Sequence, residues 1–214
     1  QQLIGFDQEL LLKLNGSNSL FWDGFMWLST NMLTWIPFAV VLLYVIFKNN
    51  KIKEALIIIA LLGVVIALAD QISSGICKPL FARFRPTQDP ELMYQIDIVN
   101  GYRGGTYGFI SSHAANTFGV AVFLTLIFKS GSLAIILFIW AILNAFSRIY
   151  LGVHYLGDIL FGTLVGVGAG ILIYIIYRKL QNTVLKQANF ISNQYTSSGY
   201  LISDIQLIKT VFYL

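Results

Sequence analysis

Charged residues are scarce in this chain. Asp, Glu, Lys and Arg make up 11% of the 214 residues, whereas an ordinary soluble domain has about 25%. Because 57% of the residues are hydrophobic, so little charge cannot cover a soluble globule, and disorder, which needs low hydrophobicity and high charge, is excluded too. The net charge is only +4, and no dense Lys/Arg cluster suggests a nucleic acid partner. These shortages indicate an integral membrane protein.

Cysteine and histidine are rare as well. The single cysteine, Cys77, excludes an internal disulfide and a cysteine-based metal site. The only two histidines are His113 and His154, and no His, Cys and Asp residues cluster at metal-ligand spacing. We therefore expect no metal ion and no other cofactor.

Five apolar stretches approach or exceed the roughly 20 residues that a helix needs to cross a bilayer. They run over 24–47, 55–77, 104–128, 130–147 and 159–177. The sequence thus predicts an all-α integral membrane helical bundle of about five transmembrane helices. A separate interfacial turn near 24–32 is the alternative at the start of the first span.

Three regions follow from this pattern. Near the N-terminus, charged residues are interspersed among apolar residues at positions 3, 4, 6, 10, 11, 12 and 14. This pattern predicts an amphipathic helix at the membrane interface over 1–16. The transmembrane domain extends over 17–180. Residues 181–214 form a cytoplasmic tail that is polar at first and too weakly apolar for a further span.

Cations gather at both ends of the predicted spans. Those at one end are Lys48, Lys51, Lys53, Lys129, Arg178, Lys179 and Lys186. The positive-inside rule makes this end cytoplasmic. Those at the outer end are Lys78, Arg83, Arg85, Arg103 and Arg148. Because five cations on the outer side run against the rule, we infer that an anionic ligand holds them there.

The first of three chemically informative segments at the outer end runs from Lys78 to Pro86. Pro79 and Pro86 each disfavour helical geometry in the residue before them. Lys78 and Arg85 are therefore expected where the second span kinks or stops, with side chains free to converge. A surface patch for anionic lipid head groups is the alternative interpretation.

The second segment contains Ser111, Ser112 and His113 at the start of a long apolar run. Serine is a preferred helix N-cap, and free backbone N–H groups at a helix start attract anions. The pattern predicts an anion site beside an imidazole. A capped membrane helix with a hydrogen-bonded histidine is the alternative.

The third segment holds Arg148, His154 and Asp158. His154 and Asp158 are four residues apart, so on a helix they share a face and can form a hydrogen bond. A carboxylate on one imidazole nitrogen fixes the tautomer and leaves the other nitrogen basic or nucleophilic. Arg148 offers two parallel donors for phosphate oxygens. In the alternative interpretation, the His–Asp pair is structural, and the Arg148 side chain extends along apolar surface to place its charge at the membrane interface.

Both histidines, one carboxylate and three cations thus fall at one membrane face, where charge is costly unless it serves a site. Since the cations outnumber the acid, we expect a multiply charged anion as their partner, and a phosphate ester fits.

The three segments resemble the motifs of the type 2 phosphatidic acid phosphatase family, which shares its site with the vanadium haloperoxidases. Two motifs match with every spacing kept, and their residues are Lys78, Arg85 and Pro86, then Ser147, Arg148, His154 and Asp158. The middle motif departs, with Ile110 for Pro and Ser112 for Gly.

This resemblance implies a chemistry. His154 would attack phosphorus and form a phosphohistidine, Asp158 would orient it, and His113 would protonate the leaving oxygen and then activate water. The phosphate oxygens would be held by Lys78, Arg85, Ser111, Ser112 and Arg148. No metal is required, because these groups supply the positive charge.

The implied function is a metal-independent membrane phosphatase for a lipid phosphate or diphosphate, in the bacterial inner membrane with its site facing the periplasm. Undecaprenyl diphosphate is the favoured substrate; phosphatidic acid, phosphatidylglycerophosphate and lipid A phosphates are alternatives. A non-catalytic lipid-phosphate-binding or transport protein remains as another class, because such a protein needs the cations but not the His154–Asp158 pair.

Three further features carry structural expectations. Asp70, inside the second span, is expected to form a hydrogen bond with Ser73, Ser74 or another helix; an indirect effect on Lys78, about two turns away, is the alternative. Glycines 162, 166, 168 and 170 give the GxxxG spacing twice, which lets helix backbones approach closely. The glycine-containing loop over 94–108 is expected to cover the site.

Overall fold

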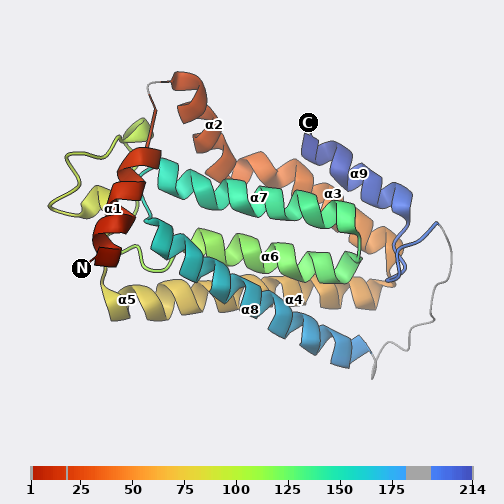
Figure 1. Cartoon of the computed structure of the whole chain (residues 1–214). Coiled ribbons are helices and arrows are strands. Elements are labelled where there is room, and N and C mark those ends of the chain that lie inside the picture. Colours follow the sequence, from red (N-terminus) through yellow and green to blue (C-terminus); the bar gives the residue numbers. More distant parts are fainter. Residues whose placement is uncertain (1, 18, 182–193, 214) are drawn as a thin grey trace.

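A set of long helices runs side by side in the computed structural model, which describes residues 2–17, 19–181 and 194–213 (Figure 1). The long helices are α3 (Ile36–Asn49), α4 (Ile52–Asp70), α6 (Ser112–Phe128), α7 (Gly131–Tyr150) and α8 (Leu156–Leu180). Helix α4 continues through a π-helical segment, η2 (Gln71–Cys77), into the short helix α5 (Lys78–Phe81). Two isolated β-bridges are the only strand-like pairings in the described part of the chain.

Within the residues that the structure describes, four helices are long and apolar enough to cross a membrane. They are Met32–Asn49, Ile52–Phe81, Gly131–Tyr150 and Leu156–Leu180. Helix α6 is apolar but has 17 residues. It lies at the centre of the bundle, against α4, α7 and α8. The predicted class, an all-α membrane bundle of about five spans, is confirmed.

Two of the predicted spans were too long. The stretch 24–47 is divided into α2 (Leu20–Thr30), a 3-10 turn η1 (Met32–Trp35) and α3. The break occurs at Asn31, whose backbone is extended and whose side chain accepts a hydrogen bond from the Leu33 N–H. The stretch 104–128 becomes helical only at Ser112, because a loop that includes Gly104 at a φ of +67° precedes it. Short 3-10 turns, η3 (Pro86–Gln88) and η4 (Val99–Gly101), interrupt the long connection before α6.

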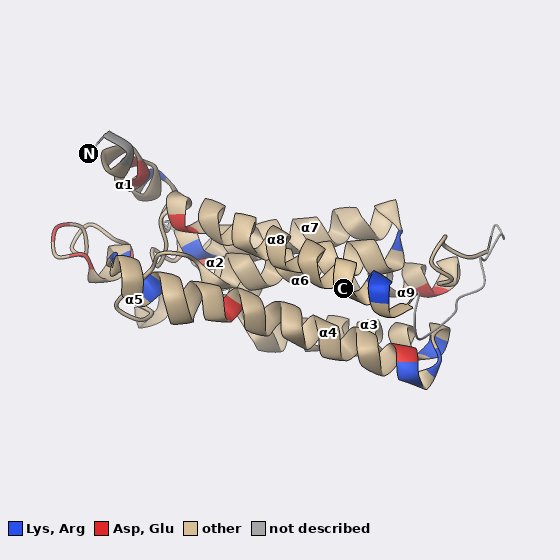
Figure 2. Ribbon diagram, turned by 90° about the horizontal axis from the view of Figure 1, so that it is seen from below, with Lys and Arg blue, Asp and Glu red and all other residues tan. Residues whose placement is uncertain are grey.

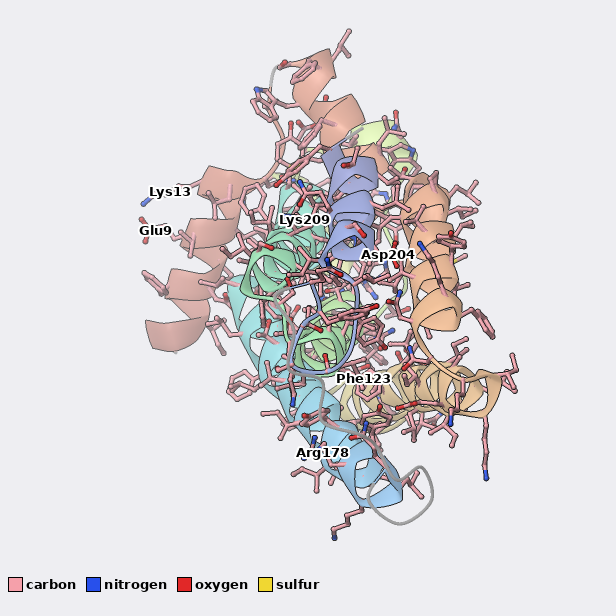
Figure 3. The ribbon with its side chains drawn as sticks, turned by 90° about the vertical axis from the view of Figure 1, so that its right-hand side faces the viewer. Glu9, Lys13, Phe123, Arg178, Asp204 and Lys209 are labelled. Atoms are coloured by element: carbon pink, nitrogen blue, oxygen red, sulfur yellow. The ribbon has the colours of Figure 1, made fainter. Side chains whose placement is uncertain are left out.

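The N-terminal helix α1 (Gln2–Leu14) is present, as predicted, and lies across one end of the bundle (Figure 1). Leu11 is fully buried, whereas Phe6 is 62% exposed. Glu9 and Lys13 form an ion pair of 2.7 Å on its outer side, pointing away from the bundle, while Phe123 of α6 lies inside (Figure 3). Its place at the membrane interface stays a prediction.

The C-terminal segment is packed on the bundle. Helix α9 (Ile202–Tyr213) lies against α3 and α7. Its Asp204 is 4% exposed and accepts hydrogen bonds from Lys48 Nζ at 2.7 Å and Asn49 Nδ2 at 2.9 Å. These buried polar contacts hold α9 against the bundle, so the described part of the predicted tail, 194–213, contains a packed helix. Its cytoplasmic location stays a prediction. The stretch 182–193 lies outside the described residues.

Charged residues gather at the two ends of the bundle and are sparse between them (Figure 2). The end at which α3 joins α4 carries the described members of the cation set that the sequence predicted to be cytoplasmic, whereas Lys186 lies outside the described residues. The opposite end, where α5 finishes and α6 and α8 begin, carries the second set. The grouping of the cations follows the prediction, and the side of the membrane that each end faces stays a prediction.

Three glycines of α8 let its backbone touch α6. A Cβ at Gly162 would lie 2.5 Å from the Ser111 carbonyl oxygen, and one at Gly170 would lie 2.7 Å from the Gly119 carbonyl oxygen. A Cβ at Gly166 would collide with the Ala115 carbonyl oxygen, whereas Gly168 faces open space. The predicted close packing is confirmed for three of the four glycines.

Replacement of Gly166 by alanine should therefore separate α6 from α8 and destabilise the protein by about 1–3 kcal/mol, the usual cost of overpacking. Gly168→Ala is the matched control on the same helix, and it should be neutral or slightly stabilising because alanine favours helix. Thermal unfolding of both variants in one detergent measures the difference. Equal melting temperatures would contradict the close packing.

Candidate active site

The loop between α7 and α8 places His154 in the interior. The backbone N–H groups of Val153 and His154 donate to the Arg148 carbonyl oxygen at 3.1 and 3.2 Å, so the chain folds tightly after α7. His154 precedes the helix and Asp158 lies in its first turn. The two side chains were expected to share a helix face. They meet instead across the helix start, where Asp158 Oδ2 accepts from the Tyr155 N–H at 3.1 Å.

His154 is completely buried and is held at both ring nitrogens. Nδ1 lies 3.2 Å from Asp158 Oδ2, and Nε2 lies 3.0 Å from Arg85 Nη1. Because arginine can only donate, Nε2 is the acceptor and Nδ1 carries the proton that Asp158 accepts. Burial, followed by the charges of Arg85 and Arg148, holds the pKa of His154 well below its usual value of 6.5. The imidazole is therefore neutral, with a lone pair on Nε2.

This shift has a measurable pH dependence. A histidine with a lowered pKa stays neutral as the pH falls through 6.5 and gains its proton only at more acidic pH. In a His113→Gln variant His154 is the only histidine, so its ¹⁵N resonances can be followed alone. We expect the neutral, Nδ1-protonated imidazole to persist below pH 6.5, where an unperturbed histidine is already mostly protonated. A titration midpoint at or above 6.5 would contradict the buried, cation-surrounded environment.

Arg85 is brought to His154 by an extended loop. Its backbone is extended before Pro86, as predicted, and its N–H donates to the Thr106 carbonyl oxygen at 3.0 Å. The guanidinium is 8% exposed and also donates to the Tyr107 and Val153 carbonyl oxygens, both at 3.2 Å. Burial and the nearby Arg148 charge lower the pKa of Arg85. These contacts aim a desolvated cation at Nε2 of His154.

Lys78 reaches the start of α6 from the long α4–α5 helix. The sequence predicted a kink or a stop at this residue. Lys78 has helical dihedral angles directly after the π-helical segment η2, and the helix stops after Phe81, where Ala82 has a φ of +45°. Pro79 is tolerated in the first turn of α5, where its missing N–H removes little. Lys78 Nζ donates to Ser112 Oγ at 3.2 Å and to Ser74 Oγ at 2.8 Å.

Asp70 acts on Lys78 through a serine. Ser74 Oγ donates to Asp70 Oδ1 at 3.1 Å and accepts from Lys78 Nζ. Ser73 Oγ donates to the Asp70 carbonyl oxygen at 3.2 Å. The expected hydrogen bonds of Asp70 are confirmed, and they orient the lysine that the sequence placed in the site.

The residues that begin α6 lie beside Asp158. Ser111 is the N-cap of α6, as predicted: its hydroxyl accepts from the Ala114 N–H at 3.4 Å. Its own N–H donates to the Asp158 carbonyl oxygen at 3.0 Å. Ser112 begins the helix with its hydroxyl at Lys78, and it needs no positive φ. Serine therefore fits where the family motif has glycine.

Arg148 approaches from the end of α7 and is 2% exposed. Its Nη1 donates to Thr30 Oγ1 and its Nη2 to the Tyr102 hydroxyl, both at 2.8 Å. Its buried Nε has no hydrogen-bond partner among the described residues. Such a donor costs free energy until an acceptor reaches it, and the oxygen of a bound anion is a suitable acceptor.

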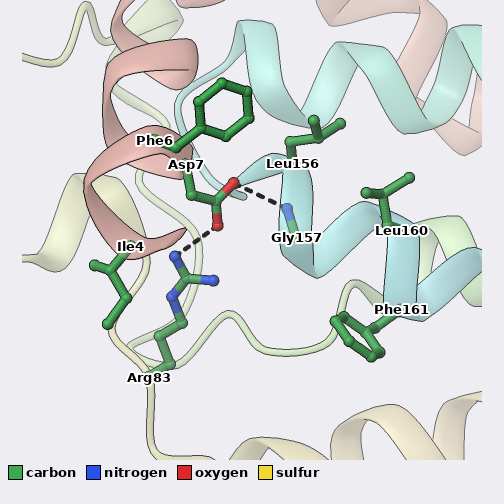
Figure 4. A pocket seen from close by; sticks show the side chains of 8 residues that line it. All are labelled: Ile4, Phe6, Asp7, Arg83, Leu156, Gly157, Leu160 and Phe161. Atoms are coloured by element: carbon green, nitrogen blue, oxygen red, sulfur yellow. Dashed lines mark hydrogen bonds and ion pairs between the residues drawn. The ribbon is translucent and has the colours of Figure 1, made fainter. Parts of the chain in front are cut away.

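Arg83 was missed as a site residue. Its Nη1 donates to Asp158 Oδ1 at 3.1 Å, its Nη2 to Asp7 Oδ2 at 2.8 Å, and its guanidinium lies 3.9 Å from the centre of the Tyr155 ring. Asp7 Oδ1 in turn accepts from the Gly157 N–H at 3.0 Å. Figure 4 shows Arg83, Asp7 and Gly157 at the edge of a 330 Å³ apolar pocket between α1 and α8.

One feature of the sequence indicated Arg83: it is one of the five cations at the outer end of the predicted spans. No feature indicated Asp7, because the burial of one charged residue of an amphipathic helix depends on tertiary contacts. Arg103 lies outside the cluster, since its Nη1 donates to the Thr87 carbonyl oxygen at 3.0 Å and braces the loop.

The described residues contain no group of three His, Cys, Asp or Glu side chains that could hold a metal ion.

The chain belongs to the PAP2 superfamily, whose family model matches residues 58–182. This range includes all eight site residues predicted from the sequence, and it confirms the type 2 phosphatidic acid phosphatase family that the motifs resemble.

Two curated relatives carry the same name, lipid A 4'-phosphatase. One, from Bacteroides thetaiotaomicron, is 42% identical over 182 residues, covering 83% of this chain and 80% of the relative. The other, from Porphyromonas gingivalis, is 36% identical over 177 residues, covering 83% and 75%.

A solved structure has the same fold. The transmembrane PAP2-type phosphatidylglycerolphosphate phosphatase of Bacillus subtilis matches with a TM-score of 0.61 over 88% of this chain and 90% of its own. The sequences are 18% identical, so this likeness concerns the fold alone.

Proposed function

We propose that this lipid phosphatase removes the 4'-phosphate of lipid A. The relatives that support this substrate are 36–42% identical to the chain over 83% of its length. The observation that carries the chemistry is the environment of His154: a buried neutral imidazole, oriented by Asp158, whose Nε2 is aimed among the arginines.

The proposed reaction has two steps. Nε2 of His154 attacks phosphorus, the bond between phosphorus and the leaving oxygen breaks, and His113 gives that oxygen a proton. The proton on Nδ1 stays in the hydrogen bond to Asp158, which stabilises the charge on the ring. In the second step His113 takes a proton from water, whose oxygen attacks phosphorus. The bond between phosphorus and Nε2 breaks, inorganic phosphate leaves, and His154 regains its lone pair.

The cations hold the transferring group. Arg85 must turn from Nε2 toward a phosphate oxygen when substrate enters, and Arg148 Nε gains its missing acceptor. Lys78 and the Ser111–Ser112 start of α6 complete the site. Because these donors are already desolvated, they stabilise the charge of the transition state without first losing water. The proposed location is the bacterial inner membrane with the site on the periplasmic side, as the cation distribution predicts.

A substrate panel tests this function. Purified protein in detergent with EDTA is given lipid A, undecaprenyl diphosphate, phosphatidic acid or phosphatidylglycerophosphate, and free phosphate is measured. We expect the highest kcat/KM with lipid A, and a product that has lost one phosphate from the 4'-position by mass spectrometry.

Three other results of this substrate panel would change the assignment. A higher kcat/KM for undecaprenyl diphosphate, the preference predicted from the sequence, would overturn the lipid A assignment and leave the chemistry intact. Lipid binding without phosphate release from any substrate would instead support the binding or transport alternative. Activity that disappears with EDTA would contradict a metal-independent mechanism.

A further inference from the structure

A cavity of 220 Å³ opens beside His113. Its walls come from η1, α6 and α7, and they include Trp35, Asn116 and Trp140. Thr30, which also lines it, accepts the hydrogen bond from Arg148 Nη1. The cavity therefore borders the proposed proton donor and a threonine that is bonded to a phosphate-binding cation. The part of the substrate behind the leaving oxygen must lie next to that proton donor.

Two polar atoms of the lining residues are buried and have no hydrogen-bond partner among the described residues. They are Asn116 Oδ1, an acceptor, and Trp140 Nε1, a donor. Their neighbours are satisfied: the Trp35 indole N–H donates to the Ser29 carbonyl oxygen at 2.8 Å, and Asn144 Nδ2 donates to the Trp140 carbonyl oxygen at 2.9 Å. Buried polar groups are nearly always paired, so these two atoms point to a ligand.

The chemistry of the two atoms narrows the ligand class. A phosphate dianion offers no proton to Asn116 Oδ1, and an acyl chain would leave both atoms unpaired. A hydroxyl group can both donate and accept. The rings of Trp35 and Trp140, whose centroids are 6.0 Å apart at 77°, supply apolar surface beside these polar atoms. A ring that carries hydroxyl groups and C–H faces matches both surfaces.

We propose that this cavity binds the sugar ring that carries the scissile phosphate and selects saccharide phosphates over glycerol phosphates. The inference rests on the proposed function, because it takes His113 as the proton donor to the leaving oxygen. Pockets for drug-sized ligands measure roughly 300–1,000 Å³, so a 220 Å³ cavity suits a single ring. The rest of the lipid lies outside it.

Two variants test the subsite. Trp140→Phe keeps an aromatic ring and removes the N–H, and Asn116→Leu removes the acceptor at similar size. The readout is the ratio of kcat/KM for lipid A to kcat/KM for the best non-saccharide substrate of the panel. We expect each variant to lower this ratio about 3- to 10-fold, the effect of one lost hydrogen bond. Thr163→Val, in a separate apolar pocket between α7 and α8, should leave the ratio unchanged.

The outcomes separate the two proposals. A wild-type protein that releases no phosphate from lipid A overturns the proposed function. A wild-type protein that cleaves lipid A, with an unchanged ratio in both variants, overturns the sugar subsite alone. Equal loss toward both substrates also overturns it, since that result indicates damage to the fold or to His113.

Discussion

Phosphate release should fall by roughly 10⁴-fold or more when His154 is replaced by alanine, because removal of an attacking nucleophile leaves only binding and electrostatic stabilisation. The variant should also fail to incorporate ³²P from a labelled lipid phosphate, whereas the wild type forms an acid-labile, base-stable phosphoenzyme. Single-turnover quench measurements separate this phosphorylation step from the later hydrolysis.

A matched variant shows that the loss is chemical. Tyr155→Phe removes a neighbouring hydroxyl that donates to Asp89 at 3.1 Å and touches no other site group through that oxygen. It should retain phosphoenzyme formation, and both variants should unfold cooperatively in detergent. Substantial phosphate release by His154→Ala would exclude the phosphohistidine mechanism.

Arg83→Met should reduce activity by about 100-fold, the usual consequence of misplacing a reactive group, and destabilise the protein by about 3 kcal/mol. Removing one partner of a buried ion pair leaves the other charge uncompensated, and the Asp158 side chain is completely buried. With Oδ1 unpaired, Asp158 no longer holds the His154 ring in one orientation. Steady-state kinetics and thermal unfolding measure the two effects.

A second substitution at Asp7 tests whether the lost stability comes from unpaired charge. In Arg83→Met, Asp7 also loses its partner at 2.8 Å, so a second change of Asp7→Asn removes an unpaired charge. The double variant should be more stable than Arg83→Met alone, although Asp7→Asn by itself is destabilising. Additive losses would show that the two residues act independently. Arg103→Met is the control for loss of a cation at this end, and it should keep activity within about threefold, since a single hydrogen bond to a backbone carbonyl is worth little.

The bundle was predictable because its determinants are local. Apolar runs of membrane-spanning length identify helices wherever they occur. The cations at the outer end were recognisable because they run against the positive-inside rule. The break at Asn31 was harder to place, because the uncharged stretch 24–47 continues through it and the hydrogen bond to Leu33 forms only in the folded chain.

The site was predictable for a different reason. Its residues occur in three short motifs whose spacing is kept, so eight of them could be named from sequence. Arg83 and Asp7 belong to the same cluster, but they meet across 76 residues. Such contacts depend on how α1 crosses the bundle end, which no local pattern encodes. The cavity beside His113 escaped prediction likewise, because it requires the broken first span.

The contact between Gly162 and the Ser111 carbonyl has a consequence for genetic data. Gly162, Gly166 and Gly170 set the distance between the helix that carries Ser111–His113 and the helix that carries Asp158. In a selection for phosphatase activity, nearly every substitution at these three positions should be depleted as strongly as changes at the nucleophile. The positions of α8 that do not tolerate substitution would therefore form a row that faces α6 and continues away from the phosphate site. Gly168, which does not face α6, should tolerate substitution.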